Sequence, residues 1–466
     1  MILKKNYLAF FLSFLLIFGY FFIGYFLDRT NYYQLLFVWF SLFGITYYLV
    51  KNQSANFTFL VAIAILFRLV FLISVPNLSQ DFYRFIWDGR MLFAGFNPYI
   101  SLPQTFIAQH NYPIPEAVHL YAGMGDFNGS HYTNYAPINQ LNFLIAALFA
   151  NKSILGSVII LRLQIILADI GIIYFGKKIL EKLQLPINNI FLYALNPFVI
   201  IELTGNLHFE SVMLFFLVWS LYKLQQQKWI WAGILLGCSV SVKLIPLLFL
   251  PLFYQWFTSA TLSNQSVINS KKETKNWTHK FSELTKLLSF YAIILGTIAL
   301  LFSPFFSQTF VNSYTDSVGL WFKNFELNAS FYYLFREIGY LFRGWNEIAI
   351  IGKIMPLLTV LFLLGITFFR KNTSLQQLIT ALLFGLSFYY FTTTTVHPWY
   401  LASLVILSVF TKYRFPIVWS LVIVFSYQVY ATTPWKENLW WVFGEYLVVY
   451  GVLIFEVFRN KKTTVI

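Results

Sequence analysis

The stretch from Ser79 to Tyr99 (SQDFYRFIWDGRMLFAGFNPY) gathers acidic and basic side chains in a chain that otherwise carries few charges. Asp81, Arg84 and Asp88 recur at i, i+3 and i+7, so a helix places them on one face. Carboxylates of this kind can act as general acids or bases, although an Asp-Arg pair on an exposed helix also forms without any function. The spacing predicts an amphipathic helix at a membrane surface.

Other unusual polar side chains are scattered along the chain, close to the ends of apolar segments. They are Arg90 in the first stretch, Tyr135 in HYTNYAPINQ, Asn206, His208 and Glu210 in ELTGNLHFE, Lys243 in SVKLIPLL, Arg336 in NASFYYLFREIGY and His397 in VHPWY. If these segments end at the same face of a membrane, the groups could meet in one cavity. We therefore treat them as candidates for one composite site.

Each candidate also has an interpretation without a function. Asp88 could serve only to hold Arg84 or Arg90, and His208 with Glu210 could form an interfacial turn. His397 could belong to the belt of amphipathic residues at a membrane interface. Lys243 differs from these, because it lies at a turn with no acid nearby in sequence. An uncompensated cation there would suit an anionic ligand group.

Composition defines the elements that must position these residues. Hydrophobic residues make up 58% of the 466 residues and charged residues only 11%, against roughly 25% in an ordinary soluble domain. The pattern predicts an all-α, polytopic membrane protein with about 12 to 14 transmembrane helices. The net charge is +14, and the basic residues lie in short runs between apolar segments. This distribution favours a role in setting the orientation of the helices in the membrane over binding of nucleic acid.

The basic runs fall on one side of the predicted membrane throughout, which identifies that side as the cytoplasm and places both termini there. Residues 1–260 form an amino-terminal transmembrane half with a large first outer loop, 76–140, that carries amphipathic helices. Residues 261–286 form a basic cytoplasmic loop, and 287–466 form a carboxy-terminal half with an outer loop at 305–347. The apolar run Leu141 to Ala150 is expected to lie flat on the outer surface.

Charges inside apolar segments need partners, since each costs roughly 2.5 to 3.5 kcal/mol near the bilayer centre. We expect a structural pair between Asp169 and either Arg68 or Arg162. The six histidines show no metal-ligand spacing, and no H-E-x-x-H or G-x-x-x-x-G-K-[ST] motif occurs. The sequence therefore predicts neither a metal site nor a nucleotide-driven pump, and no cofactor.

The first outer loop resembles that of integral-membrane glycosyltransferases of the C superfamily, in particular bacterial polyprenyl-phosphate-mannose-dependent mannosyltransferases. The resemblance continues in YAPINQ, LNPFVIIELTGNLHFESVM, SVKLIPLLFLP and VHPWYL. It implies transfer of a hexose, such as mannose, from a polyprenyl phosphate to a glycan or glycolipid acceptor. The reaction would take place at the outer, periplasmic face of a bacterial inner membrane, with membrane lipids as further partners.

The same resemblance assigns roles to individual residues. Asp81 would be the general base of an inverting transfer, and Lys243, followed by Arg336 and Arg90, would bind the donor phosphate. His397 would be a further donor, and Asp88 would orient the loop through an arginine or bind sugar hydroxyls. The remaining candidates, Arg84, Tyr135, Asn206, His208 and Glu210, would support substrate binding. His208-Phe209-Glu210 departs from the His-Asn-Asp type of sequence common in the family.

Two other functions are compatible with the residues alone. A transporter or flippase for a lipid-linked sugar or other envelope precursor would line a path through the bilayer midplane with ionisable groups. A catalytically silent partner in envelope assembly would not depend on Asp81. Collection of the ionisable groups at one face favours the glycosyltransferase.

Overall fold

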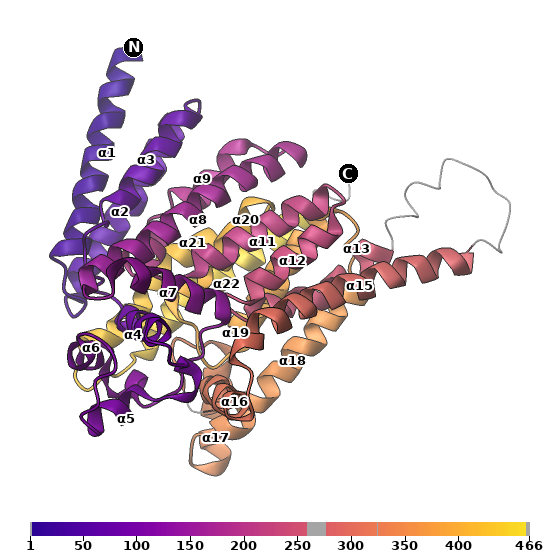
Figure 1. Ribbon diagram of the computed structural model, residues 1–466. Coiled ribbons are helices and arrows are strands. Elements are labelled where there is room, and N and C mark those ends of the chain that lie inside the picture. Colours follow the sequence, from indigo (N-terminus) through magenta and orange to yellow (C-terminus); the bar gives the residue numbers. More distant parts are fainter. Residues whose placement is uncertain (1, 259–275, 324, 463–466) are drawn as a thin grey trace.

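The computed structural model describes residues 2–258, 276–323 and 325–462, and in these ranges helices are the regular elements (Figure 1). An isolated parallel bridge joins Leu327 to Thr395, and no strand is formed in the described ranges. The high content of Leu, Phe and Ile in long uninterrupted segments accounts for this, because a helix satisfies every backbone polar group within one apolar segment. The all-α prediction is confirmed.

The helices follow one another with short connections. The amino-terminal part contains α1 (Ile2–Tyr25), α2 (Tyr32–Asn52), α3 (Phe57–Leu69), α4 (Asp81–Phe93), η1 (Pro98–Ile100), α5 (Pro103–Ala108), α6 (Ala117–Gly129), α7 (Pro137–Ala150), α8 (Ile154–Lys182), η2 (Ile187–Ile190), α9 (Phe191–Ala194), α10 (Pro197–Val199), η3 (Ile200–Gly205), α11 (Glu210–Gln225), α12 (Trp229–Val240), η4 (Ile245–Phe253) and α13 (Tyr254–Thr258). The carboxy-terminal part contains α15 (Asn276–Phe302), η6 (Ser303–Phe305), α16 (Gln308–Lys323), α17 (Phe331–Arg343), α18 (Ile348–Phe369), α19 (Leu375–Thr392), η7 (Pro398–Leu401), α20 (Ala402–Val409), α21 (Phe415–Val422), η8 (Ile423–Ala431) and α22 (Leu439–Lys462).

Six helices in the described ranges are long and apolar enough to cross a membrane, and a bent pair of shorter helices could supply a seventh span. The six are Tyr7–Tyr25, Tyr32–Asn52, Ile154–Lys182, Ser282–Phe305, Ile348–Phe369 and Leu439–Asn460. The polytopic membrane prediction is therefore confirmed. The count of 12 to 14 spans stays a prediction, because it includes apolar helices of 10–17 residues.

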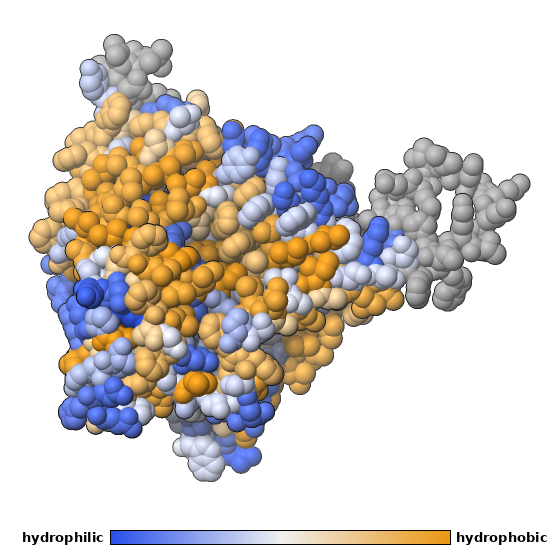
Figure 2. Space-filling model, viewed as in Figure 1, coloured by the Kyte–Doolittle hydropathy of each residue, from blue (hydrophilic) through white to orange (hydrophobic). Residues whose placement is uncertain are grey.

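Large apolar side chains cover the outside of these helices. Phe10, Phe14 and Phe18 on α1 are each more than 60% exposed. Figure 2 shows hydrophobic surface across much of the visible face, with hydrophilic residues gathered toward its lower left and its upper right. Contiguous apolar surface of this extent is typical of contact with lipid.

The two predicted outer loops lie at the same end of the molecule. Figure 1 shows α4, α5, α6 and α17 at one end and both chain ends toward the other. Ser317 of α16 donates to the carbonyl of Tyr132 (2.7 Å), and Tyr314 donates to that of Asn134 (3.3 Å). The second loop is therefore fastened to the first, as a composite site requires.

The boundary between the basic loop and the carboxy-terminal transmembrane half stays a prediction. Residues 261–275 of the predicted basic loop lie outside the described ranges, but α15 already begins at Asn276 rather than near residue 287. The segment NWTHKFSELTKLL contains polar residues but neither Gly nor Pro, so nothing in it ends a helix. The helix therefore extends through polar residues that the sequence analysis assigned to the loop.

Helix α7, which contains the apolar run Leu141 to Ala150, packs between α4 and α8. A Cβ atom at Gly89 of α4 would lie 2.2 Å from the carbonyl oxygen of Phe143, so glycine permits the close crossing. Beside it, the rings of Phe85 and Phe143 stack with centroids 4.7 Å apart. Through this contact α7 holds α4 against the transmembrane part.

The expected pair inside the apolar helices is present, and the partner of Asp169 is Arg68. Arg68 Nε lies 2.7 Å from Asp169 Oδ2, and both side chains are 1% exposed. Arg162 instead donates to the carbonyls of Thr204 and Gly205 in the π-helix η3. These are the last carbonyls of the helix and lack partners within it, so Arg162 is structural as well.

Candidate active site

Helix α4 begins at Asp81, the proposed base. The acidic side chain lies in its first turn and Arg90 in its last, where each complements the helix dipole. The predicted helix is confirmed, but it is not a surface helix with a solvated face: nine of its residues are buried under neighbouring helices. Arg84 and Asp88 neutralise each other within the helix, and Glu116 in an adjoining loop neutralises Arg90, which makes this burial possible.

Asp88 and Arg84 form a buried ion pair that positions the loop. Arg84 Nε lies 2.8 Å from Asp88 Oδ1, and Gln140 donates to the other carboxylate oxygen at 3.0 Å. Arg84 also donates to the carbonyls of Asn128 (2.7 Å) and His131 (2.8 Å). Both residues therefore fasten the connection between α6 and α7 to α4.

Arg90 fastens a different part of the same loop. It lies 3.0 Å from Glu116 and donates to the carbonyl of Pro115 at 2.6 Å, and its side chain is fully buried. Sequence reasoning had Arg90 as a ligand of the donor phosphate. The guanidinium is instead paired with Glu116, 26 residues later in the chain. Arg90 does not line the cavity described next.

A cavity of about 860 Å³ opens where the first outer loop meets the transmembrane part. This volume is within the range of roughly 300 to 1,000 Å³ typical of small-molecule sites. The predicted site residues that line it are Asp81, Tyr135, Glu210, Lys243 and His397. These residues come from five segments of the chain, so the structure brings together five of the predicted candidates.

The other six candidates do not line this cavity. They are Arg84, Asp88, Arg90, Asn206, His208 and Arg336. The expectation that all the polar groups would meet in one cavity is therefore wrong for these residues. Each of the six has polar partners outside the cavity.

Asp81 is a half-buried carboxylate. It lies in the cavity wall, and its side chain makes no hydrogen bond or ion pair with any residue that the structure describes. Loss of solvation raises its pKa to about 6, with Glu210 also raising it and Lys243 lowering it. A carboxyl group titrating near neutral pH can accept a proton from a substrate hydroxyl.

Lys243 is not the uncompensated cation that sequence reasoning expected. Its ammonium forms an ion pair with Glu210, whose side chain is 2% exposed, and also lies 5.9 Å from the centre of the Tyr400 ring. Glu210 precedes it by 33 residues, on another helix, which hid the pair from inspection of neighbouring sequence. Lys243 remains 23% exposed, so part of the ammonium still faces the cavity.

Helix α7 also fixes the turn that carries Lys243. Asn139, which is buried, donates to the carbonyl of Val242 at 3.0 Å, and the backbone N–H of Ile138 donates to that of Ser241 at 2.8 Å. Since α7 also packs on α4, the same helix positions both Asp81 and Lys243. The spacing of acid and cation in the cavity thus depends on one rigid element.

A stack of rings forms the wall beside Lys243. Trp399 lies between His397 (centroids 4.5 Å apart) and His208 (3.8 Å apart). Burial and the nearby Lys243 lower the pKa of His397 to about 3, so this ring is neutral at physiological pH. Behind the stack, Asn206 donates to Glu202 at 3.3 Å. His208 and Asn206 therefore support the wall rather than face a substrate.

Arg336, expected at the donor phosphate, is engaged in the second outer loop. It lies 2.8 Å from Glu326 and 3.0 Å from Glu337, and its guanidinium packs over the ring of Tyr333 at 4.4 Å. With two carboxylates as partners its charge is already neutralised. The structure therefore does not support Arg336 as a ligand of an anionic substrate.

One side of the cavity is apolar. It is lined by Leu244, Ile245, Leu247, Leu248, Pro356 and Val360, which come from η4, the residue before it, and α18.

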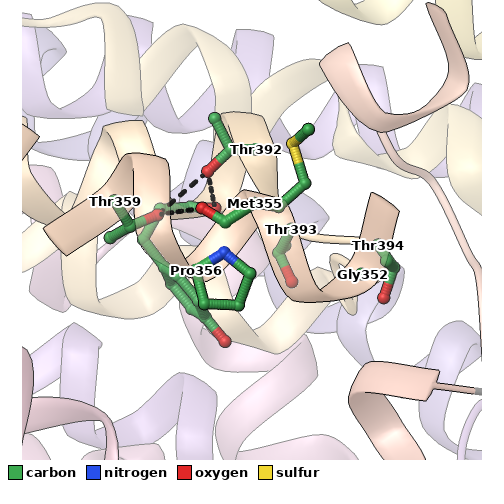
Figure 3. Close-up of a pocket in the computed structure, with 8 residues that line it drawn as sticks. Gly352, Met355, Pro356, Thr359, Thr392, Thr393 and Thr394 are labelled. Carbon is green, nitrogen blue, oxygen red and sulfur yellow. Dashed lines mark hydrogen bonds between the residues drawn. The ribbon is translucent and has the colours of Figure 1, made fainter. Parts of the chain in front are cut away.

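A second, much smaller cavity of about 10 Å³ lies between α18 and α19. Figure 3 shows its lining, where Thr359 donates to the carbonyl of Met355 (3.2 Å) and forms a hydrogen bond with Thr392 (3.1 Å). That space holds at most one water molecule.

Sequence reasoning missed several residues that line the main cavity. They include Arg29, Gln80, Asp126, Asn128, Tyr389, Tyr390, Trp399, Tyr400, Tyr430 and Trp435. The sequence pattern does not distinguish the aromatic members from the many Phe and Tyr that face lipid or the core of such a chain. The signal that could have identified them was their position near the outer end of an apolar segment. Many aromatic residues outside the cavity share that position, so it does not single out the cavity residues.

No group of three or more His, Cys, Asp or Glu within the described ranges is arranged to hold a metal ion. The cavity offers instead an unpaired carboxylate, a partly exposed ammonium, an aromatic wall and an apolar side. In an all-helical protein of the membrane, this combination is compatible with an enzyme that transfers a sugar between membrane-bound substrates.

Comparison with known families makes the assignment specific. Residues 26–260 match the family model described as alpha-(1->6)-mannopyranosyltransferase, N-terminal domain (MptA_B family), and the chain belongs to this family. The match includes α4, the Lys243 turn and the cavity segments of Tyr135 and Glu210, but not that of His397. A search of curated proteins finds no match. Family membership supports mannosyl transfer from a sugar donor to a glycan acceptor as the activity.

Proposed function

We propose that the protein transfers mannose from a polyprenyl phosphate to a glycan or glycolipid at the outer face of a bacterial inner membrane, with inversion at the anomeric carbon and Asp81 as general base. The observation that carries the proposal is the Asp81 carboxylate. Among the described residues it has no side-chain partner, and it shares a cavity with the Lys243-Glu210 pair.

The proposed reaction follows from these groups. The acceptor hydroxyl gives its proton to Asp81 as its oxygen attacks the anomeric carbon of the mannose. The bond between that carbon and the phosphate oxygen breaks, and the lipid phosphate leaves with the electron pair. Lys243 stabilises the added negative charge, for which its ammonium has donors beyond the one that binds Glu210.

The apolar side of the cavity supports a lipid donor over a soluble one. The leucines and Ile245 of the η4 segment, together with Val360 of α18, give a polyprenyl chain a surface next to Lys243. Val360 is 48% exposed, and α18 is one of the helices long and apolar enough to cross a membrane. A phosphate bound by Lys243 can therefore keep its lipid at the membrane side of the site.

The cavity also favours an enzyme over a transporter. Its charged lining residues come from segments at the end of the molecule that carries α4, α6 and α17 (Figure 1). A transporter would need ionisable groups along a path between both faces. The buried charges deeper in the helices, Arg68 and Asp169, instead neutralise each other.

Transfer assays with purified protein test the donor. Radiolabelled mannose would be supplied on a polyprenyl phosphate or on a nucleotide diphosphate, with an α-(1->6)-linked mannotriose as acceptor. We expect elongation of the trisaccharide only with the lipid donor, and a product whose new anomeric bond has the configuration opposite to that in the donor. Transfer from the nucleotide donor alone would refute the proposal.

A further inference from the structure

We propose that Arg29, Tyr430 and Trp435 form a subsite that binds a sugar ring of the acceptor, next to the ring that receives the mannose. The inference rests on the proposed function, since it concerns the second substrate of the same cavity. All three residues line the cavity, yet they come from the α1-α2 turn and from the end of η8 with the loop that follows.

The three side chains form one compact cluster. The Arg29 guanidinium carbon lies 5.0 Å from the centre of the Tyr430 ring and 5.3 Å from that of Trp435. The two rings meet edge to face, with centroids 5.1 Å apart and an interplanar angle of 86°. Stacking against two aromatic rings fixes the guanidinium without using its N–H groups.

Nothing in the described part of the chain engages those N–H groups: Arg29 has no hydrogen bond or ion pair there. Trp435 is 57% exposed and lines the cavity, so its ring is accessible to a ligand. The cluster therefore presents an apolar face beside free donors. A pyranose ring has the matching surfaces, with C–H groups on its faces and hydroxyls around its edge.

The cluster is correctly placed for the acceptor. Both Asp81 and Arg29 act electrostatically on Tyr430, so the cluster adjoins the proposed base. The cavity lining also contains the polar residues Gln80, Asp126 and Asn128 of the first outer loop, whereas η4 and α18 contribute mostly apolar residues.

Asp126 adds an acceptor for sugar hydroxyls on the same polar side. It receives a hydrogen bond from Tyr121 at 3.1 Å and remains exposed. Arg84 holds the carbonyl of the neighbouring Asn128, so the buried pair with Asp88 stabilises this side of the cavity. An acceptor bound here would leave the η4 side free for the lipid donor.

Kinetics of three variants test the subsite. For Trp435→Ala and for Arg29→Met we expect the KM of the mannotriose to rise about tenfold, as for removal of an anchoring side chain, with the donor KM unchanged. Trp435→Phe should retain most of the affinity. Trp440→Ala is the matched control, since Trp440 is 80% exposed but does not line the cavity.

Binding without a donor separates this inference from the proposed function. Calorimetric titration of the mannotriose into wild type and Trp435→Ala should show a weaker complex for the variant. Equal affinity, or a rise in donor KM in place of acceptor KM, would overturn the subsite. Trp435-dependent binding by a wild type that accepts no lipid donor would support the subsite and refute the donor assignment.

Discussion

The pH dependence of transfer depends on the charges around Asp81, and two substitutions should move it in opposite directions. A base with a pKa of about 6 is roughly nine-tenths ionised at about pH 7 and roughly one-tenth ionised at about pH 5. Activity requires the ionised form, so kcat/KM should fall about tenfold between these pH values as Asp81 takes up a proton.

Glu210→Gln removes the carboxylate that raises the pKa of Asp81 and releases the charge of Lys243, which lowers it. Both effects favour ionised Asp81, so the acid limb should shift to lower pH. Lys243→Met has the opposite effect, because Glu210 is left without its cation. The shift is read from the midpoint of each profile, independently of any loss in maximal rate.

The assay is kcat/KM for the lipid donor at a fixed acceptor concentration well below its KM, so that the profile reports the protonation states of the free enzyme. Purified variants in one detergent should first give the same thermal unfolding profile. A wild-type limb in the ordinary aspartate range near pH 4, or a shift of both variants in the same direction, would refute the assignment of Asp81 as the base.

Three further predictions follow from individual contacts. Arg84→Met leaves Asp88 buried without its cation and should destabilise the fold by about 3–5 kcal/mol, measured by unfolding in detergent; unchanged stability would contradict the structural role. Arg336→Met should alter donor KM little, because Arg336 is paired outside the cavity; a large rise would restore it as a phosphate ligand. With Cys238 replaced, Asp126→Cys should react with an impermeant thiol reagent added outside intact cells, and labelling only after lysis would contradict the proposed orientation.

Most of what the sequence could predict about the site came from the side of the membrane on which each polar residue was placed. Sorting polar residues by the face at which their segments end selected Asp81, Lys243 and His397, and all three line one cavity. The local pair of Arg84 and Asp88 was also accessible, since i,i+4 residues face each other on a helix.

Contacts between distant segments were not accessible. Glu210 reaches Lys243 from another helix, and Glu116 reaches Arg90 across the first outer loop. Each of these acids changes the expected role of its partner. Charge spacing along one segment carries no information about such partners, which depend on how the helices pack.

Aromatic residues set a second limit. Trp435 and Trp440 lie five residues apart and are both exposed, but only Trp435 lines the cavity. Hydropathy treats them alike, because both fit the aromatic belt of a membrane interface. Only the position of Arg29, some 400 residues earlier in the chain, distinguishes the two.

Mannosyl transfer by Asp81→Asn tests the central claim most directly. Asparagine keeps the size of the side chain but cannot take the proton of the acceptor. We expect transfer from the polyprenyl-phosphate donor to fall by about 10²- to 10⁴-fold, with unchanged expression, unfolding profile and mannotriose binding. Transfer at the wild-type rate would contradict the account.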